Sequence, residues 1–130
     1  MATVFSKIIN GEIPCYKIAE NERFLAFLDI SPLAKGHTLV VPKAEVDYIF
    51  DQEDVILSEI LIFSKRIAKA IDKTMNCKRV GIAVIGLEVP HTHIHLVPMN
   101  NIGDLNFARP KLTLQKEEFE KIAAKIIAAL

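Results

Sequence analysis

The feature that most constrains the fold is a long stretch in which apolar residues recur every three or four positions. The residues with this spacing are Ile56, Ile60, Phe63, Ile67, Ile71 and Met75. Such spacing places apolar side chains on one face of a helix, with the charged residues on the other faces. We therefore predict an amphipathic helix of about 24 residues, in which Asp51 caps the start and the apolar stripe packs into a core.

Shorter apolar runs lie on both sides of this helix and have the branched content of β-strands. They are Cys15 to Ala19, Arg23 to Leu28, His37 to Val41 and Val80 to Ile85. The polar residues 20–22 between the first two runs predict a hairpin. A short helix is expected after Phe5, stopped by Asn10 and Gly11, and a last helix is expected to open at Thr113. Strands joined by short turns, with helices packed on them, predict an α+β fold with an antiparallel sheet.

Length and charge limit the kinds of partner. The chain has 130 residues, of which 51% are hydrophobic, and this suits one domain spanning 1–130. Sixteen basic residues balance sixteen acidic ones, so no long-range field favours a nucleic acid polymer or an anionic membrane. The start of the sequence has no signal-type apolar run, and the two cysteines form no motif. These features predict a cytoplasmic protein that acts on a small molecule.

Three of the four histidines stand at alternate positions in one short run. His91, His93 and His95 are separated by Thr92 and Ile94, and the run lies between two prolines. Alternation predicts a strand with the three imidazoles on one face. Imidazole can serve as acid, base, nucleophile or metal ligand near neutral pH. The run therefore predicts a reactive surface.

Strand geometry helps to choose between the possible chemistries. Same-face neighbours on a strand are about 6.6 to 7 Å apart, whereas imidazole nitrogens on one zinc ion lie about 3.3 Å from one another. His91 and His95 therefore cannot easily share an ion, and Cys15 and Cys77 are isolated. A phosphoryl group suits the row better, because a central imidazole can face phosphorus while its neighbours reach other oxygens. A metal site formed by His93 with either neighbour, and histidines held only by structural hydrogen bonds, remain alternatives.

Three separated blocks of the sequence resemble a known family. The run HTHIHLV, which begins at His91, resembles the HxHxHxx motif of the histidine triad (HIT) superfamily of nucleotide hydrolases and transferases. The blocks FSKIINGEIP, FLAFLDISPLAKGHTLVVPK and GLEVPHTHIHLVP resemble its members in the same order, over about residues 4 to 99. The resemblance implies an antiparallel sheet of about five strands with one long central helix, a short N-terminal helix and a C-terminal helix. It also implies a homodimer that pairs through the long helix and a sheet edge.

The resemblance also implies catalytic roles. His93 resembles the family's nucleophile, which attacks the α-phosphate of a nucleotide and forms a nucleotidyl-imidazole that water later cleaves. A neutral imidazole nitrogen is competent for this step at neutral pH. His95 resembles the partner that hydrogen-bonds the phosphate or the leaving group, and His91 with His37 resembles the pair that orients the row. Neighbouring imidazoles cannot all be charged cheaply, so we expect a neutral nucleophile in a coupled cluster.

Further residues resemble the family's nucleotide-binding positions. Asp29 resembles the acid that accepts hydrogen bonds from the ribose hydroxyls, for which a carboxylate is suited because it offers two acceptor oxygens. A turn or capping role before Ser31 remains its alternative. The positions that resemble the lining of the base pocket are Phe5, Ile8, Phe27, Leu28, Ile30 and Leu39. Each of these could also be plain core.

The chain departs from the family at several positions. Some members hold a structural zinc ion where this chain has Thr3, Ser6 and Glu45, so we expect no such zinc. Leu87 stands where many members have a phosphate-binding glutamine. Residues 100–130 form a divergent C-terminal loop and helix, and the chain lacks tryptophan.

The resemblance implies a hydrolase or transferase that needs no cofactor or metal. The expected substrate is a nucleotide conjugate cleaved at the α-phosphate, of the nucleoside phosphoramidate or dinucleoside polyphosphate type. The alternatives are a catalytically weak nucleotide-binding or scaffolding dimer and a histidine-based metal-binding protein.

Overall fold

An antiparallel five-stranded sheet forms the centre of the structure, a computed structural model that describes residues 2–130. The strand order is β1-β2-β3-β5-β4, and every neighbouring pair is antiparallel. The strands are β1 (Lys17–Glu20), β2 (Phe24–Leu28), β3 (Thr38–Pro42), β4 (Arg79–Ala83) and β5 (Ile94–Met99). The helices are α1 (Val4–Ile9), α2 (Asp54–Thr74) and α3 (Lys116–Ala128), with short 3₁₀ helices η1 (Ile49–Asp51) and η2 (Ile102–Asp104). The predicted α+β fold is confirmed.

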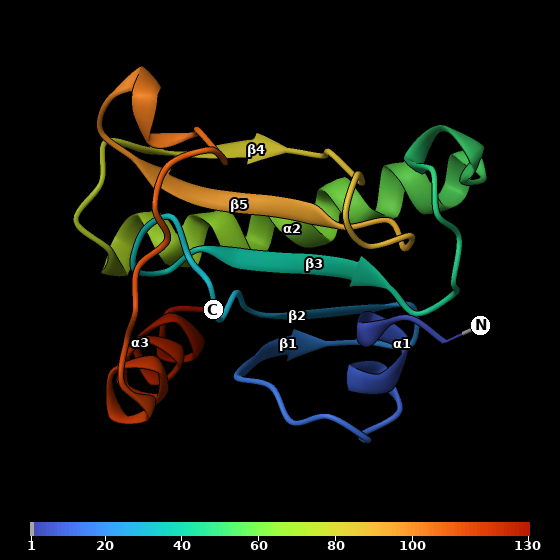
Figure 1. Cartoon of the computed structure of the whole chain (residues 1–130), viewed down its shortest axis with the longest axis horizontal. Helices are drawn as coiled ribbons and strands as arrows, with labels where there is room; N and C mark the ends of the chain where they lie inside the picture. Colours follow the sequence, from blue (N-terminus) through green and yellow to red (C-terminus); the bar gives the residue numbers. More distant parts are fainter. Residues whose placement is uncertain (1) are drawn as a thin grey trace.

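The main core lies between one face of the sheet and the two long helices. Strand alternation directs Phe24, Ala26 and Leu28 of β2 to this face, where they join residues of α2 and α3. Ile67 and Ile71 of α2 are fully buried there. Figure 1 shows α2 running behind the strands and α3 beside it. The apolar stripe of α2 is therefore core, as its spacing predicts.

The opposite face of the sheet carries a second, smaller core beneath α1. Phe5 of α1 packs there against Leu25 and Phe27 of β2 and Leu39 of β3. Thr3 caps this helix, because its hydroxyl accepts a hydrogen bond from the Ser6 N–H. The helix covers only part of the face, and the candidate site occupies the remainder.

Two predicted helix starts are wrong by a few residues. Asp51 ends η1 instead of capping α2, and Glu53 takes the N-cap position of a helix that begins at Asp54. The cause is local, because Gln52 is extended and separates the two helical segments. Thr113 likewise lies before the helix, and α3 begins only at Lys116, after an extended Gln115 at the N-cap position. Within residues 2–130, none of the helices is both long and apolar enough to cross a membrane.

Candidate active site

The structure brings all four histidines together on the α1 side of the sheet. His95 lies in β5 opposite Leu39 of β3, and His37 directly precedes β3. His91 and His93 lie in the loop that leads into β5. At most 8% of any of the four residues is exposed. Strands β3 and β5, together with the residues just before them, therefore supply a cluster of imidazoles that is nearly closed to solvent.

The prediction of a strand running through all three alternating histidines is wrong. β5 begins only at Ile94, because the backbone before it bonds elsewhere. The Thr92 N–H donates to the Val46 carbonyl at 2.7 Å, and the Thr92 hydroxyl donates to the same oxygen at 2.7 Å. These bonds tie the run to the loop after β3. His91 consequently lies behind the reactive surface instead of on it.

Hydrogen bonds determine which nitrogen of His37 and His95 carries the proton. The Leu33 N–H donates to His37 Nδ1 at 3.0 Å, so the proton of a neutral His37 is on Nε2. His37 Nε2 lies 3.0 Å from His95 Nδ1 and donates to it. His95 therefore carries its own proton on Nε2. This chain of donors leaves His95 with an N–H for a ligand.

The same reasoning gives the opposite result for His93. His93 Nδ1 lies 2.7 Å from the carbonyl oxygen of His91, which can only accept, so Nδ1 carries the proton. His93 Nε2 is then unprotonated, and it has no hydrogen-bond partner among residues 2–130. A neutral imidazole with a free lone pair is a nucleophile.

His91 acts as a fixed support for this arrangement. Its Nε2 donates to the Pro42 carbonyl at 2.7 Å, and its Nδ1 receives the Thr3 hydroxyl proton at 3.2 Å. Both ring nitrogens are therefore occupied, and the residue is fully buried. Its carbonyl is held where it accepts from His93.

Burial keeps His37, His93 and His95 neutral near pH 7. It lowers the pKa of His37 to about 3 and the pKa of His95 to about 4. Burial also lowers the pKa of His93, although the hydrogen bond to the His91 carbonyl acts in the opposite direction. Neighbouring histidines lower all three further. The proton positions derived above therefore describe the form present at neutral pH.

A cleft of about 530 Å³ opens over His93 and His95. The predicted nucleotide-binding residues all line it: Phe5, Ile8, Phe27, Leu28, Asp29, Ile30 and Leu39. His37 and His91 do not line it and lie behind its wall. The structure thus brings the predicted site residues together: His93, His95 and the nucleotide-binding residues line the cleft, and His37 and His91 lie behind them.

Asp29 lies where the cleft meets the buried histidines. Its Oδ1 accepts from the Ser31 N–H at 2.8 Å, so the turn that its sequence position allows is also present. Its Oδ2 lies 3.6 Å from His37 Nε2. Burial raises the pKa of the carboxyl, while the Ser31 hydrogen bond opposes this. One carboxylate oxygen is thus engaged by the turn, and the other faces the histidines.

Among the cleft residues that sequence reasoning missed are Phe107 and Lys111. Both come from the connection between η2 and α3, which lies outside the three blocks that resemble the family. No periodicity or motif in that connection points to the cleft. Their position follows from the path of the chain.

Comparison with known proteins identifies the family. The HIT domain family model matches residues 10–102. This chain belongs to the HIT domain family. An uncharacterized HIT-like protein of Borreliella burgdorferi is 37% identical over 131 residues, which cover 95% of this chain and 94% of the relative. The adenosine 5′-monophosphoramidase of Schizosaccharomyces pombe is 34% identical over 128 residues, which cover 97% and 96% of the two chains.

A solved structure agrees with this assignment. The crystal structure of a HIT-like protein from Bartonella henselae superposes with a TM-score of 0.85 at 30% sequence identity. The superposition covers 98% of this chain and 96% of the other. The predicted resemblance to the histidine triad superfamily is confirmed, and so is the sheet-and-helix arrangement that it implies.

In this HIT domain, the groups expected to replace zinc ligands are joined to one another. The Glu45 carboxylate accepts from the Ser6 hydroxyl and, at 3.4 Å, from the Thr3 N–H. The Thr3 hydroxyl in turn donates to His91 Nδ1, which removes that lone pair from metal binding. Hydroxyls and one carboxylate are also a poor match for zinc, which prefers thiolate and imidazole. This donor set does not fit a structural zinc ion.

A different trio of donor atoms lies close together in this domain. Single atoms of Asp29, His37 and His95 fall within 4.8 Å of one another. The sequence-based metal alternative named other pairs, His93 with His91 or with His95. For His37 Nε2 to bind a metal, its proton would have to move to Nδ1, where the Leu33 N–H donates. Metal binding would therefore break a buried hydrogen bond.

Proposed function

We propose that this HIT domain cleaves nucleotide conjugates at the α-phosphate through a nucleotidyl-His93 intermediate. The observation that carries the proposal is the unprotonated Nε2 of His93 at the cleft. The His91 carbonyl, which accepts from Nδ1, enforces that tautomer. Attack by Nε2 on phosphorus gives the ring a positive charge, and the bond from Nδ1–H to the carbonyl strengthens as that charge develops. The support for the nucleophile is therefore in place before substrate binds.

Each step of the proposed reaction has a group on the protein. His93 Nε2 forms a bond to phosphorus, and the bond from phosphorus to the leaving group breaks, with the electron pair remaining on the leaving atom. When the leaving atom is the nitrogen of an amine, it also takes up a proton from solvent. His95 Nε2–H donates a hydrogen bond to the phosphate or the leaving group. Water then attacks phosphorus, the phosphorus–nitrogen bond breaks, and neutral His93 returns. The proton released by water goes to the products.

The rest of the cleft suits a nucleoside. Asp29 supplies carboxylate oxygens for the ribose hydroxyls. The apolar side chains of Phe5, Ile8, Phe27 and Leu39 offer a surface for the base. The relative from S. pombe is an adenosine 5′-monophosphoramidase, which supports a purine nucleotide of the phosphoramidate type. A dinucleoside polyphosphate presents the same α-phosphate with a different leaving group and is the second substrate type that we propose.

The test compares wild-type protein with His93→Ala. Each is mixed with adenosine 5′-phosphoramidate or with diadenosine tetraphosphate, and released mononucleotide is measured by chromatography. We expect release by wild type and none above background by the variant, with urea denaturation showing that the variant is folded. Ile102→Ala serves as a control, because that side chain is 95% exposed and lies away from the cleft. Full activity of His93→Ala would disprove the proposal.

Mass spectrometry of protein quenched in alkaline denaturant, in which a phosphorus–nitrogen bond to histidine survives, locates the intermediate. We expect a nucleotidyl adduct on His93, and an adduct on His95 would reverse the two roles. Tight nucleotide binding without release would favour a catalytically weak scaffold instead. Leu87 gives that alternative some support, because this 89% exposed apolar side chain lines the cleft and offers no hydrogen bond to a phosphate.

We also propose that the protein forms a cytoplasmic homodimer through β4 and α2. β4 is an edge strand whose Ile82 is 49% exposed, and Leu61 and Ile62 of α2 are 57% and 68% exposed. Unpaired edges and exposed apolar side chains favour association. Light scattering should give twice the chain mass for wild type and a smaller mass for Ile62→Glu. A wild-type mass of one chain would disprove the dimer.

The proposed cytoplasmic location is supported by the free thiols of Cys15 and Cys77, which suit a reducing compartment. Cell fractionation tests this location.

A further inference from the structure

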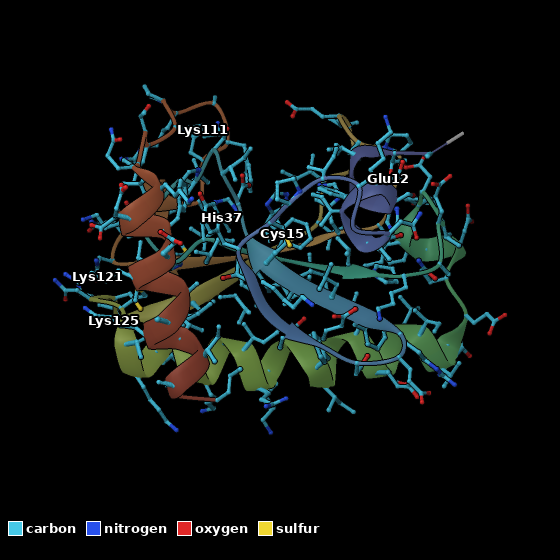
Figure 2. All side chains as sticks on the ribbon, turned by 90° about the horizontal axis from the view of Figure 1, so that it is seen from below. Glu12, Cys15, His37, Lys111, Lys121 and Lys125 are labelled. Carbon is cyan, nitrogen blue, oxygen red and sulfur yellow. The ribbon has the colours of Figure 1, made fainter. Side chains whose placement is uncertain are left out.

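A segment from the C-terminal part of the chain crosses the His95 end of the cleft. The Leu112 N–H donates to the Pro32 carbonyl at 2.8 Å and ties the segment to the loop before β3. The ring of Phe107 meets His95 edge-on, with centroids 4.6 Å apart, and lies 6.1 Å from His37. Figure 2 shows Lys111 on the side of the sheet opposite α2. The segment follows residue 102, where the match to the HIT domain ends.

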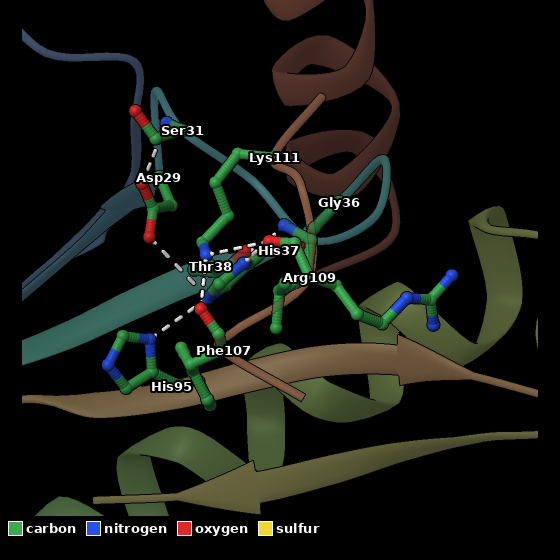
Figure 3. A network of polar contacts seen from close by, with 10 residues as sticks. Asp29, Ser31, Gly36, His37, Thr38, His95, Phe107, Arg109 and Lys111 are labelled. Atoms are coloured by element: carbon green, nitrogen blue, oxygen red, sulfur yellow. Dashed lines mark hydrogen bonds and ion pairs between the residues drawn. The ribbon is translucent and has the colours of Figure 1, made fainter. Parts of the chain in front are cut away.

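Two backbone carbonyls of this segment hold the ammonium group of Lys111. Lys111 Nζ donates to the carbonyl of Phe107 at 2.5 Å and to that of Arg109 at 3.1 Å (Figure 3). An ammonium group has three N–H bonds, so one remains for a ligand. The carbonyls fix the position of a side chain that would otherwise be free to move. The group is thus oriented before any substrate arrives.

Lys111 is the only lysine or arginine among the described residues that line the cleft. The other charged groups there, Asp29 and Glu88, are acidic. Burial has the largest effect on both neighbouring pKa values, raising that of Asp29 and lowering that of His37, and the positive charge of Lys111 acts to lower both. The neutral histidines add no positive charge at pH 7. Lys111 is therefore the one fixed cation that these residues offer to an anionic substrate.

The position of Lys111 relative to the nucleophile shows which part of the substrate it meets. The rings of His93 and His95 are 5.0 Å apart, and the ring of Phe107 lies 4.6 Å from that of His95. Lys111 donates to the Phe107 carbonyl, so it lies at the His95 end of the cleft. In an in-line displacement, the leaving group departs on the side of phosphorus away from the nucleophile. Lys111 thus lies at the end of the cleft where His95 is proposed to donate to the phosphate or the leaving group.

We propose that Lys111 binds a negatively charged leaving group, so that this protein prefers nucleotides joined to a further phosphate over nucleotides joined to an amine. This inference rests on the proposed function and adds the substrate class. When the phosphorus–oxygen bond to a leaving phosphate breaks, the electron pair stays on the leaving oxygen, and the ammonium group balances that charge. No proton is needed. An amine, by contrast, must take up a proton to leave, and Lys111 gives it no electrostatic advantage.

The test measures kcat/KM for diadenosine tetraphosphate and for adenosine 5′-phosphoramidate with wild type, Lys111→Met, Lys111→Arg and Lys116→Met. Lys116 is exposed and lies outside the cleft, so its variant makes the same change of charge without touching the site. We expect Lys111→Met to lower kcat/KM for the tetraphosphate about tenfold or more, the usual effect of losing a charged hydrogen bond. The loss for the phosphoramidate should be much smaller. Lys111→Arg should retain most of the preference, and Lys116→Met should match wild type.

The outcomes separate this inference from the proposed function. Equal losses for both substrates with Lys111→Met would show that the side chain only holds the segment, and would overturn the inference alone. If neither kcat/KM value changes in Lys111→Met, the inference is also overturned while the proposed function stands. If wild type cleaves neither substrate, or if His93→Ala cleaves both at the wild-type rate, the proposed function fails and the inference fails with it.

Discussion

Acid should destabilise this protein well before its carboxylates titrate, because burial holds histidines neutral in the folded state. His37 is 1% exposed with a pKa of about 3, and His95 is 8% exposed with a pKa of about 4. In the unfolded chain both return to an ordinary histidine pKa of about 6.5. Below that value the unfolded state binds more protons than the folded state. Their contribution to stability is thus complete above about pH 6.5 and is lost as the pH falls toward the folded pKa values.

The magnitude follows from the shifts. Each such histidine lowers the free energy of unfolding by about 1.4 kcal/mol for every pH unit below its unfolded pKa. Between pH 7 and pH 5 the pair should therefore remove about 4 kcal/mol, out of the roughly 5 to 15 kcal/mol that domains possess. Asp29 faces His37 and acts in the opposite direction, because burial raises its pKa and favours proton uptake in the folded state. The stabilising effect of Asp29 grows only as the pH falls toward the pKa of its carboxyl group.

Urea denaturation at pH 7, 6 and 5, at constant ionic strength, measures this loss. The matched variant is His95→Asn, whose amide oxygen can still accept from His37 Nε2–H but does not titrate. We expect the variant to lose only about half as much stability as wild type over the same range. A wild-type loss below about 1 kcal/mol, or an equal loss in the variant, would refute the idea that these rings are neutral in the folded protein.

Three substitutions test other parts of the structure. Thr3→Val leaves the buried His91 Nδ1 without its donor. It should lower the free energy of unfolding, measured with urea, by about 2 kcal/mol and should also lower kcat; unchanged stability would contradict the hydrogen bond. Gly36→Ala should lower the free energy of unfolding by about 1 to 3 kcal/mol, because Gly36 has φ +98° and an added Cβ would lie 2.7 Å from Met75 Cγ. Calorimetry measures this loss, and a stabilised variant would be inconsistent with it. Asp29→Asn should weaken calorimetrically measured binding of adenosine monophosphate about tenfold and leave the 2′,3′-dideoxy analogue nearly unaffected, whereas equal weakening of both would exclude ribose recognition.

Local patterns predicted the elements of the fold well and their ends less well. The spacing of Ile60, Ile67 and Ile71 predicts a buried helix face, and all three are buried in α2. The ends of elements depend on hydrogen bonds that periodicity does not record. The extended backbone at Gln52 delays α2, and the bonds from Thr92 to the loop after β3 delay β5.

The candidate site was likewise predicted in part from local patterns, while its details depend on contacts that those patterns do not record. Alternation predicted a reactive surface at the histidine run, and the resemblance predicted which residues would gather around it. The proton positions of His37, His91 and His95 could not be predicted, since they depend on Leu33 and Pro42, which lie far from the histidine run in the sequence. The contribution of Lys111 was also unpredictable, because only the path of the C-terminal segment brings it to the cleft.

The sequence by itself determined the α+β class, the HIT family and the candidate reactive residues, because side-chain periodicity and motif spacing are local properties of the chain. Tertiary structure alone decided that His91 lies behind the wall of the cleft, that His37 Nε2 contacts His95 Nδ1, and that Lys111 adds a cation to the cleft. Each of these depends on a contact between segments distant in sequence. Such contacts form only when the sheet and helices have packed.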